Sequence, residues 1–254
     1  MSMSKGKISI QSLNLHFGKH HILKDVNIEI PENQITVILG PSGCGKTTLM
    51  KTLNRLVELD EKVKISGSII IDNEDIFHTK TDVTDIRKKM GLLSQRPSPL
   101  PMSIYNNIAY GLRINGVRGR KKLTPLVEKY LRQANLWDEV KDRLREPASK
   151  LSIGQQQRLC LARGLAVNPE IILADEPSSA LDPISAAIIE KQFVELKNDY
   201  TVVLVTHVLR QARRIADYVV FMYLGEVIEQ GPVNDFFENP KMEKTREYLR
   251  GAFN

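Results

Sequence analysis

The stretch "ITVILGPSGCGKTT", residues 35–48, decides the fold of this chain. It opens with a short apolar run, Ile35–Leu39, which is typical of a strand buried on both faces of a sheet. The run leads into the pattern G-x-x-x-x-G-K-[ST], whose fixed positions are Gly40, Gly45, Lys46 and Thr47. A helix is predicted to follow over residues 47–56. Because strand, glycine-rich loop and helix come in this order, we predict a phosphate-binding loop rather than a chance turn.

The chemistry of such a loop explains its composition. Glycines let the backbone wrap closely around a phosphate, and successive N–H groups and the next helix N-terminus attract the anion. Lys46 is predicted to reach the β- and γ-phosphates, and the Thr47 hydroxyl to bind Mg²⁺. Cys44 is expected only to be a small residue that fits. The residues predicted to contact a nucleotide here are Gly40, Pro41, Ser42, Gly43, Cys44, Gly45, Lys46, Thr47 and Thr48.

Other apolar patterns predict the rest of an α/β fold. Three further continuous runs, Ile171–Ala174, Thr201–Val205 and Tyr218–Tyr223, predict strands of a mostly parallel sheet. Helical stretches such as Ile184–Leu196 separate them, which indicates an α/β core. Residues 121–144 are typical of helices and predict a helical insert. The N-terminal part alternates with a period of two instead, which predicts half-buried antiparallel strands with Ile8, Ile10, Val26, Ile28 and Ile30 facing inward.

An acidic pair follows one of the predicted parallel strands. In "IILADEP", Asp175 and Glu176 stand at the carboxyl end of the strand, where α/β proteins bind ligands. Asp175 is expected to hold Mg²⁺, directly or through water. Glu176 is then available to orient and deprotonate an attacking water. Two solvated acids capping a strand are the alternative, and the phosphate loop in the same chain favours the catalytic interpretation.

A second anion-binding feature lies in "KLSIGQQQRLCLARGL", residues 150–165. Ser152 precedes Gln155 by three positions, which is the S-x-x-Q pattern of a capping box at a helix start. The first turn of such a helix carries unpaired N–H groups and a partial positive charge. The sequence therefore predicts a second helix N-terminus that can face an anion.

Composition narrows the class of protein. The chain has 254 residues, 42% hydrophobic and 26% charged, as in ordinary globular proteins. No stretch approaches the length of a membrane span, no apolar segment that would mark a secretory signal follows the opening "MSMSKGK", and two cysteines favour a reducing cytoplasm. The net charge of +6 gathers at residues 113–122 and 210–214. These clusters are a solvated surface or contact an acidic partner or a membrane face, and nucleic acid is not expected because no aromatic residues are interleaved.

Together these motifs resemble those of ABC transporter nucleotide-binding subunits, in the family's order and over nearly the whole chain. The resemblance implies ATP and Mg²⁺ as cofactors. It makes Gln95 a residue that touches Mg²⁺ and senses a transmembrane partner, and His207, at the end of "LVTH", a γ-phosphate contact. Phe17 is implied to stack on adenine, with His16 or His20 as competitors. The signature motif includes Ser152, Gly154 and Gln155, and the segment called the D-loop, residues 179–182, includes Asp182.

The resemblance also implies an architecture and partners. Residues 1–254 would form a single ABC ATPase domain, with a P-loop NTPase core, an N-terminal antiparallel β subdomain and a helical subdomain inserted at about 96–160. Two subunits would form a head-to-tail homodimer, in which each signature helix faces the γ-phosphate held by the other. The dimer would lie at the cytoplasmic face of the membrane on two permease subunits. Ile153 stands where the family has glycine, which implies ordinary helical dihedrals there.

Two stretches outside the shared motifs, "PMSIYNNIAYG" (101–111) and "LWDEVKDRL" (136–144), resemble the ATPases of phosphate importers. This narrower resemblance implies phosphate as cargo and, indirectly, a phosphate-binding protein. An importer of another oxyanion or small solute is the alternative. Soluble ABC ATPases of DNA repair or translation are disfavoured, because they carry a long coiled coil or two cassettes. A non-enzymatic nucleotide-binding scaffold should lack Glu176 or His207.

Overall fold

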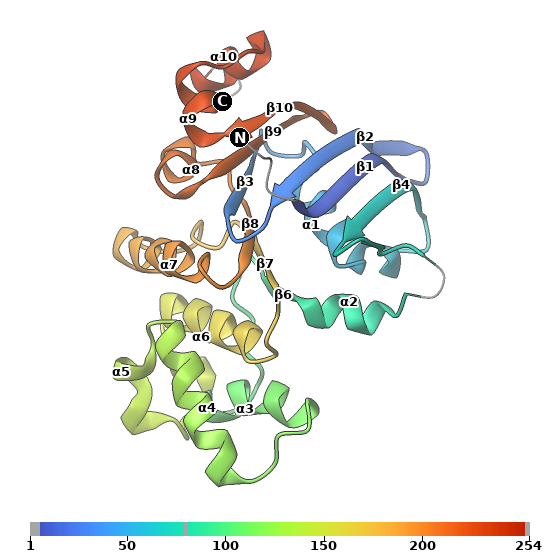
Figure 1. Ribbon diagram of the computed structural model, residues 1–254. Helices are drawn as coiled ribbons and strands as arrows, with labels where there is room; N and C mark the ends of the chain where they lie inside the picture. Colours follow the sequence, from blue (N-terminus) through green and yellow to red (C-terminus); the bar gives the residue numbers. More distant parts are fainter. Residues whose placement is uncertain (1–5, 79–80, 252–254) are drawn as a thin grey trace. The chain divides into compact units, whose positions relative to one another are not determined.

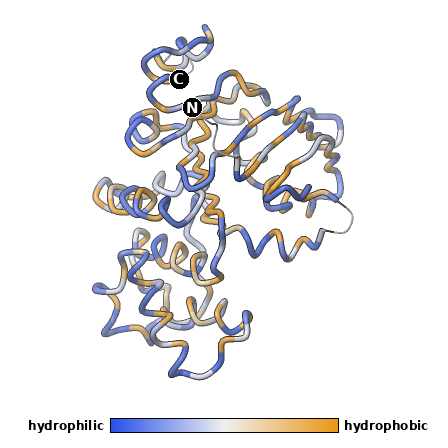
Figure 2. The backbone as a smooth tube through the Cα atoms, viewed as in Figure 1, coloured by the Kyte–Doolittle hydropathy of each residue, from blue (hydrophilic) through white to orange (hydrophobic). Residues whose placement is uncertain are grey.

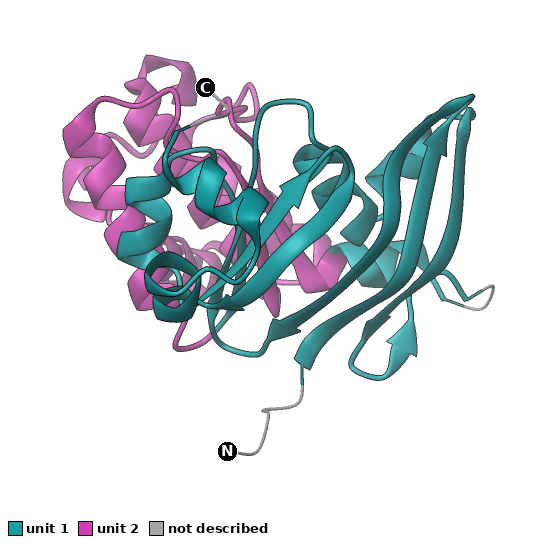
Figure 3. Cartoon of the chain, turned by 90° about the horizontal axis from the view of Figure 1, so that it is seen from above, with its two compact units in different colours: residues 1–87, 200–254 teal, residues 88–199 magenta. Residues whose placement is uncertain are grey.

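The computed structural model describes residues 6–78 and 81–251, which fall into two compact units (Figure 3). The first unit joins residues 1–87 with 200–254, and the second comprises residues 88–199. The chain thus leaves the first unit after its N-terminal third and returns to it after the second unit is complete. Among the described residues, no helix is long and apolar enough to cross a membrane.

An antiparallel sheet fills the N-terminal part of the first unit (Figure 1). Its strands lie in the order β2-β1-β4-β5, with bounds β1 Gly6–Phe17, β2 His20–Pro31, β4 Val63–Ile71 and β5 Glu74–Asp75. Ile8 pairs with Ile30 and Ile10 with Ile28, and all four side chains are buried. Hydropathy alternates along these strands, as Figure 2 shows. The predicted half-buried antiparallel strands are confirmed.

The second sheet of this unit carries the phosphate loop. Its strands are β3 Ile35–Leu39, β8 Thr201–Val205, β9 Tyr218–Tyr223 and β10 Glu226–Pro232. β3 lies between β9 and β8 and runs parallel to both, whereas β10 is antiparallel to β9. All residues of β3 and β8 are buried. Continuous apolar runs were predicted to form such strands, and the bounds of β3, β8 and β9 agree with the prediction.

Helices complete both units. The first unit contains α1 Lys46–Leu53, the 3₁₀ helix η1 Leu56–Leu59, α8 Leu209–Ile215, α9 Val233–Glu238 and α10 Glu243–Leu249. The second unit pairs β6 Met90–Leu93 in parallel with β7 Ile171–Asp175. Its helices are α3 Ile104–Ile114, α4 Arg120–Gln133, α5 Trp137–Val140, η2 Lys141–Arg143, η3 Ala148–Lys150, α6 Ile153–Leu165 and α7 Pro183–Leu196. Helix α2, Val83–Lys89, spans the boundary between the units.

Two helices differ from their predicted bounds. The helix after the phosphate loop was predicted over residues 47–56, but it ends at Leu53. Arg55 has a left-handed backbone with φ 58°, and the Asn54 side chain accepts a hydrogen bond from the Leu56 N–H at 3.1 Å. Asparagine competes for backbone hydrogen bonds in this way and so ends helices. By contrast, the helix predicted at Ile184–Leu196 begins only one residue earlier, at Pro183.

One carboxylate fixes the start of β3. Asp217 accepts a hydrogen bond from the Ile35 N–H at 2.9 Å, and its own N–H donates to the Ile35 carbonyl at 2.9 Å. Its carbonyl also accepts from Val233. Asp217 therefore ties the phosphate-loop strand to the starts of β9 and α9.

Replacing Asp217 tests this tie. In Asp217→Ala the Ile35 N–H loses a charged acceptor, so we expect the free energy of unfolding to fall by about 1–3 kcal/mol. Urea denaturation measures it, and Asp199→Ala, at an exposed aspartate, is the matched control. Equal effects of the two substitutions would contradict the assignment.

Candidate nucleotide-binding site

The phosphate loop folds back tightly from β3 before α1 begins. A Cβ atom at Gly40 would lie 2.2 Å from the Met222 carbonyl oxygen, so only glycine fits there. The Cys44 N–H donates to the Pro41 carbonyl at 3.3 Å, and Gly45 is the N-cap of α1. Ser42 and Gly43 are exposed. The loop therefore forms a turn closed at its base and open to solvent at its tip, next to a helix N-terminus, as the sequence predicts.

Lys46 lies over this turn. Its Nζ atom donates to the Gly40 carbonyl at 2.7 Å and to the Pro41 carbonyl at 2.8 Å. The residue is 6% exposed, and these carbonyls compensate for the burial of its charge. An ammonium group held at the loop can exchange a carbonyl for a phosphate oxygen, which forms a stronger charge-assisted bond.

Tyr248, in α10, supports the loop from beneath and was missed by sequence reasoning. Its hydroxyl is hydrogen-bonded by the backbone of Gly40, and its ring stacks on Phe221 of β9 with centroids 4.5 Å apart. Burial, followed by the nearby Cys44, raises the pKa of Tyr248 to about 12, so the hydroxyl keeps its proton at neutral pH. Glu229 anchors this helix, because its carboxylate accepts from the backbone N–H groups of Lys241 and Met242 at 2.8 and 3.1 Å. No sequence motif marks this support.

The first unit also holds the other predicted nucleotide contacts. The Thr206 N–H donates to the Ile38 carbonyl at 3.2 Å, so His207 follows β8 at the same sheet edge at which the phosphate loop follows β3. His207 is exposed there. Phe17 is the last residue of β1 and is half-buried. His16 stacks on His21 with ring centroids 3.9 Å apart, so one face of its ring is covered.

In the second unit, the carboxyl ends of β6 and β7 bring Gln95 and Glu176 together. The Gln95 amide nitrogen donates to Glu176 Oε2 at 3.2 Å and to Ser179 Oγ at 3.2 Å. Glu176 has φ 44°, which is uncommon for a residue other than glycine and is typical of functional sites. Asp175, the last residue of β7, is half-buried. A carboxylate held by an amide at a sheet edge is suited to orient a water molecule and accept its proton.

The signature segment forms the predicted capping box. Ser152 Oγ accepts from the Gln155 N–H at 3.3 Å, and Gln155 Oε1 accepts from the Ser152 N–H at 3.1 Å. Ile153 is the first residue of α6 and is not among the positive-φ residues, so its expected helical dihedrals are confirmed. A Cβ at Gly154 would lie 2.6 Å from Ser185 Oγ. Packing against α7 therefore already requires glycine at position 154, independently of any phosphate.

Asp182 is a helix cap in this structure. Its carboxylate accepts from the N–H groups of Ile184 and Ser185, both at 3.0 Å, at the start of α7. Hydrogen bonds from the Ser185 side chain and backbone lower the pKa of Asp182, so it stays ionised. Its predicted nucleotide contact stays a prediction.

The residues present suit the cofactors that the motifs imply. The close turn at Gly40, the open tip and the Lys46 ammonium form a cradle for a nucleotide polyphosphate. The predicted metal ligands, Thr47, Gln95 and Asp175, offer hydroxyl, amide and carboxylate oxygens, which Mg²⁺ prefers. Among the described residues no cluster of three His, Cys, Asp or Glu side chains could hold a metal alone. Mg²⁺ sites in proteins commonly use one or two carboxylates together with the substrate's phosphates.

A phosphate loop between a buried parallel strand and a helix defines a P-loop nucleotide-binding protein. The family described as ABC transporter matches residues 23–179. Proteins named "Phosphate import ATP-binding protein PstB 3" from two strains of Streptococcus pneumoniae, one of serotype 4, are each 49% identical over 248 residues, or 98% of this chain and 99% of the relative. The chain belongs to the ABC transporter family, and as predicted it is an ATPase of that family.

Solved structures agree on the fold. CbiO1 from Clostridium perfringens, described as part of the ABC transporter complex cbiONQ, superposes with a TM-score of 0.81 and 26% identity over 98% of both chains. A bacterial Atm1-family ABC exporter with ATP bound also gives a TM-score of 0.81, at 24% identity, over all of this chain and 43% of that one. The predicted ABC ATPase fold is confirmed. The predicted roles of the individual residues and the bounds of the helical subdomain stay predictions.

Removing the Lys46 ammonium tests the phosphate loop. Because a hydrogen bond to a charged group contributes about 1.5–3 kcal/mol, we expect Lys46→Ala to weaken ATP binding by about 10–100-fold. Isothermal titration calorimetry measures the affinity. Lys51→Ala, an exposed lysine on the same helix, is the control and should bind ATP normally. Unchanged ATP affinity of the Lys46→Ala variant would show that the loop does not bind the nucleotide.

Proposed function

We propose that this chain is the ATP-hydrolysing subunit that powers import of inorganic phosphate through a membrane permease. The assignment of the cargo rests on the relatives of nearly equal length that are named for phosphate import. The observation that carries the enzymatic role is the Glu176 carboxylate at the end of β7, held by Gln95. In this proposal the subunit lies at the cytoplasmic face of the membrane, where a phosphate-binding protein supplies the permease from the other side.

The site residues then divide the tasks of hydrolysis among them. Lys46 and the loop N–H groups hold the β- and γ-phosphates, and His207 contacts the γ-phosphate at the end of β8. Glu176 accepts a proton from the attacking water while Gln95 keeps its carboxylate oriented. Thr47, Gln95 and Asp175 would hold Mg²⁺, which neutralises charge on the phosphates when it is bound. Phe17 stacks on adenine.

The signature helix needs a second copy of the chain. The phosphate loop already gives the nucleotide one helix N-terminus in its own subunit, so the N-terminus of α6 is available for another anion. We propose a head-to-tail homodimer in which Ser152, Gly154 and Gln155 face the γ-phosphate held by the partner subunit. Asp182, in the D-loop, is proposed to contact the nucleotide as well. The capping hydroxyl of Ser152 then turns from its own helix to the phosphate.

Glu176→Gln tests hydrolysis and cargo together. Glutamine keeps the size and hydrogen bonding but cannot accept the proton, so turnover should fall by about 10²–10⁴-fold while ATP still binds. Phosphate uptake by cells that carry the variant in place of the native chain should stop. Hydrolysis near the wild-type rate would exclude Glu176 as the base. If the wild-type subunit hydrolyses ATP normally but phosphate uptake continues in cells that lack the subunit, phosphate is excluded as the cargo.

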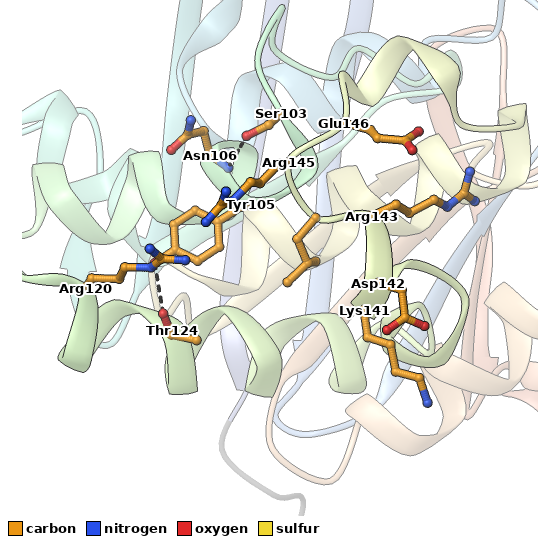
Figure 4. Close-up of a pocket in the computed structure, with 11 residues that line it drawn as sticks. Ser103, Tyr105, Asn106, Arg120, Thr124, Lys141, Asp142, Arg143, Arg145 and Glu146 are labelled. Carbon is orange, nitrogen blue, oxygen red and sulfur yellow. Dashed lines mark hydrogen bonds between the residues drawn. The ribbon is translucent and has the colours of Figure 1, made fainter.

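The permease is proposed to dock on the segment Arg96–Tyr110 and the helices after it. In the second unit, a cavity of about 660 Å³ lies beside this segment (Figure 4). Ser103, Tyr105 and Asn106 line it from the start of α3, and Arg120 and Thr124 line it from α4. The remaining wall is the stretch from Lys141 to Glu146. A cavity this size is large enough to receive side chains of a partner loop.

The chemistry of this cavity favours an acidic loop. Its lining holds four cationic side chains against two carboxylates, namely Arg120, Lys141, Arg143 and Arg145 against Asp142 and Glu146. Within the described part of the chain, neither Arg120 nor Arg145 has a carboxylate partner, and both extend toward Tyr105 in Figure 4. Tyrosine and arginine are among the residue types enriched at the energetic centres of interfaces.

Cysteine crosslinking to the co-expressed permease tests the docking face. Single cysteines at Ser98 and Met102, both exposed in this segment, should crosslink efficiently, whereas one at Lys191 on α7 should not. Adding Arg120→Glu and Arg145→Glu should reduce the crosslinks, because it reverses the charge of the cavity. Efficient crosslinks only from Lys191→Cys, or no effect of charge reversal, would contradict the proposed docking.

A further inference from the structure

The side chain of the signature glutamine is held by a residue outside every shared motif. Gln155 Nε2 donates to Glu139 Oε2 at 2.8 Å, from α6 to α5. The other end of the same amide, Oε1, accepts the Ser152 N–H. Glu139 is therefore one hydrogen bond away from the capping box. Arg143 adds a longer contact to Gln155 Oε1 at 3.4 Å.

Glu139 is itself fixed by a buried arginine. Arg158 Nη1 donates to Glu139 Oε1 at 2.6 Å, and Nη2 donates to Oε2 at 3.1 Å. The Arg158 side chain is 5% exposed and also donates to the Asn135 carbonyl, so it cannot move freely. Burial raises the pKa of Glu139, but the hydrogen bonds from Arg158 and Gln155 outweigh it and the pKa is lowered. The carboxylate is thus ionised and bound on both oxygens at neutral pH.

We propose that Glu139 is a positioning residue for the signature motif. It holds Gln155, and through Gln155 the Ser152 backbone, so that the first turn of α6 meets the phosphate in one conformation. This inference rests on the proposed function, in which Ser152 acts on ATP held by the partner subunit. A reacting group that is held in place avoids the entropic cost of orientation, and small misplacements reduce rates strongly.

The alternative to positioning is a purely structural role for Glu139. The pair Glu139–Arg158 could serve only to join α5 to α6. In that case variants would lose activity only to the extent that they lose thermal stability. A positioning residue, by contrast, affects turnover even when the variant remains stable. Glu139→Gln alone leaves the Arg158 charge buried without its partner, which is destabilising. The double variant Glu139→Leu/Arg158→Met removes both charges together, so that no buried charge is left without a partner, and the new leucine lies at a site where the Glu139 side chain is 42% exposed.

For the double variant we expect near-wild-type thermal stability and ATP affinity, with kcat lowered about 10–100-fold. A second comparison does not depend on that variant being stable. Gln155→Met leaves the ion pair intact but removes the bond to Glu139. If Glu139 acts through Gln155, adding Glu139→Gln to Gln155→Met lowers kcat no further. A further loss of kcat of the size that Glu139→Gln causes alone, or wild-type kcat in a folded double variant, overturns the proposal.

Mixed dimers separate this inference from the proposed function. Lys46→Ala subunits are combined either with Ser152→Arg subunits, as the reference, or with Glu139→Leu/Arg158→Met subunits. If sites are shared between subunits, each mixture contains one site with both lesions and one with none, so activity should return in both. No recovery in the reference mixture refutes the shared site itself. Recovery in the reference mixture but not in the Glu139 mixture leaves the shared site intact. It refutes only the proposal that Glu139 acts together with Ser152 on the nucleotide held by the partner subunit.

Discussion

The contact between Gly40 and β9 is the constraint on which the candidate site depends. The backbone passes so close to the Met222 carbonyl that no side chain fits at Gly40, and Tyr248 supports the same residue through its hydroxyl. Because this point is fixed, the loop must turn back at once and α1 must begin at Lys46. The Lys46 ammonium then lies on the Gly40 and Pro41 carbonyls. The turn after β3, the start of α1 and the placement of the cation thus follow from one close approach.

The parts of the fold that could be predicted from sequence are those whose cause is local. Strands β3, β8 and β9 agree with their predicted bounds because burial on both faces demands unbroken apolar runs. The capping box of α6 likewise follows from two side chains three positions apart. The end of α1 was predicted wrongly, because Asn54 and the left-handed Arg55 act against a pattern that remains apolar through Leu56.

The parts of the site that were missed depend on contacts between distant segments. Tyr248 lies at the other end of the chain from Gly40, and only folding brings its hydroxyl to the loop. Glu139 stands in "LWDEVKDRL", a stretch that marks the resemblance to phosphate importers but carries no recognisable chemistry by itself. Its role becomes visible only when Arg158 and Gln155 are seen on its two oxygens. Gly154 shows the converse. The motif explains this glycine by phosphate binding alone, but the close approach of Ser185 gives a structural reason for it as well.

The capping box also bears on the free energy of using Ser152 as a phosphate ligand. In this structure its hydroxyl accepts from the Gln155 N–H at 3.3 Å, a long hydrogen bond. In the proposed dimer the hydroxyl donates its own hydrogen to a phosphate oxygen, and a bond to a charged acceptor is about twice as strong as a neutral one of about 1 kcal/mol, so the phosphate can reorient the hydroxyl. The second bond of the box, from the Ser152 N–H to Gln155 Oε1, can persist during this reorientation, because Glu139 holds the amide from its other end. In the proposed dimer the signature helix therefore turns its hydroxyl to the phosphate while its backbone stays in place.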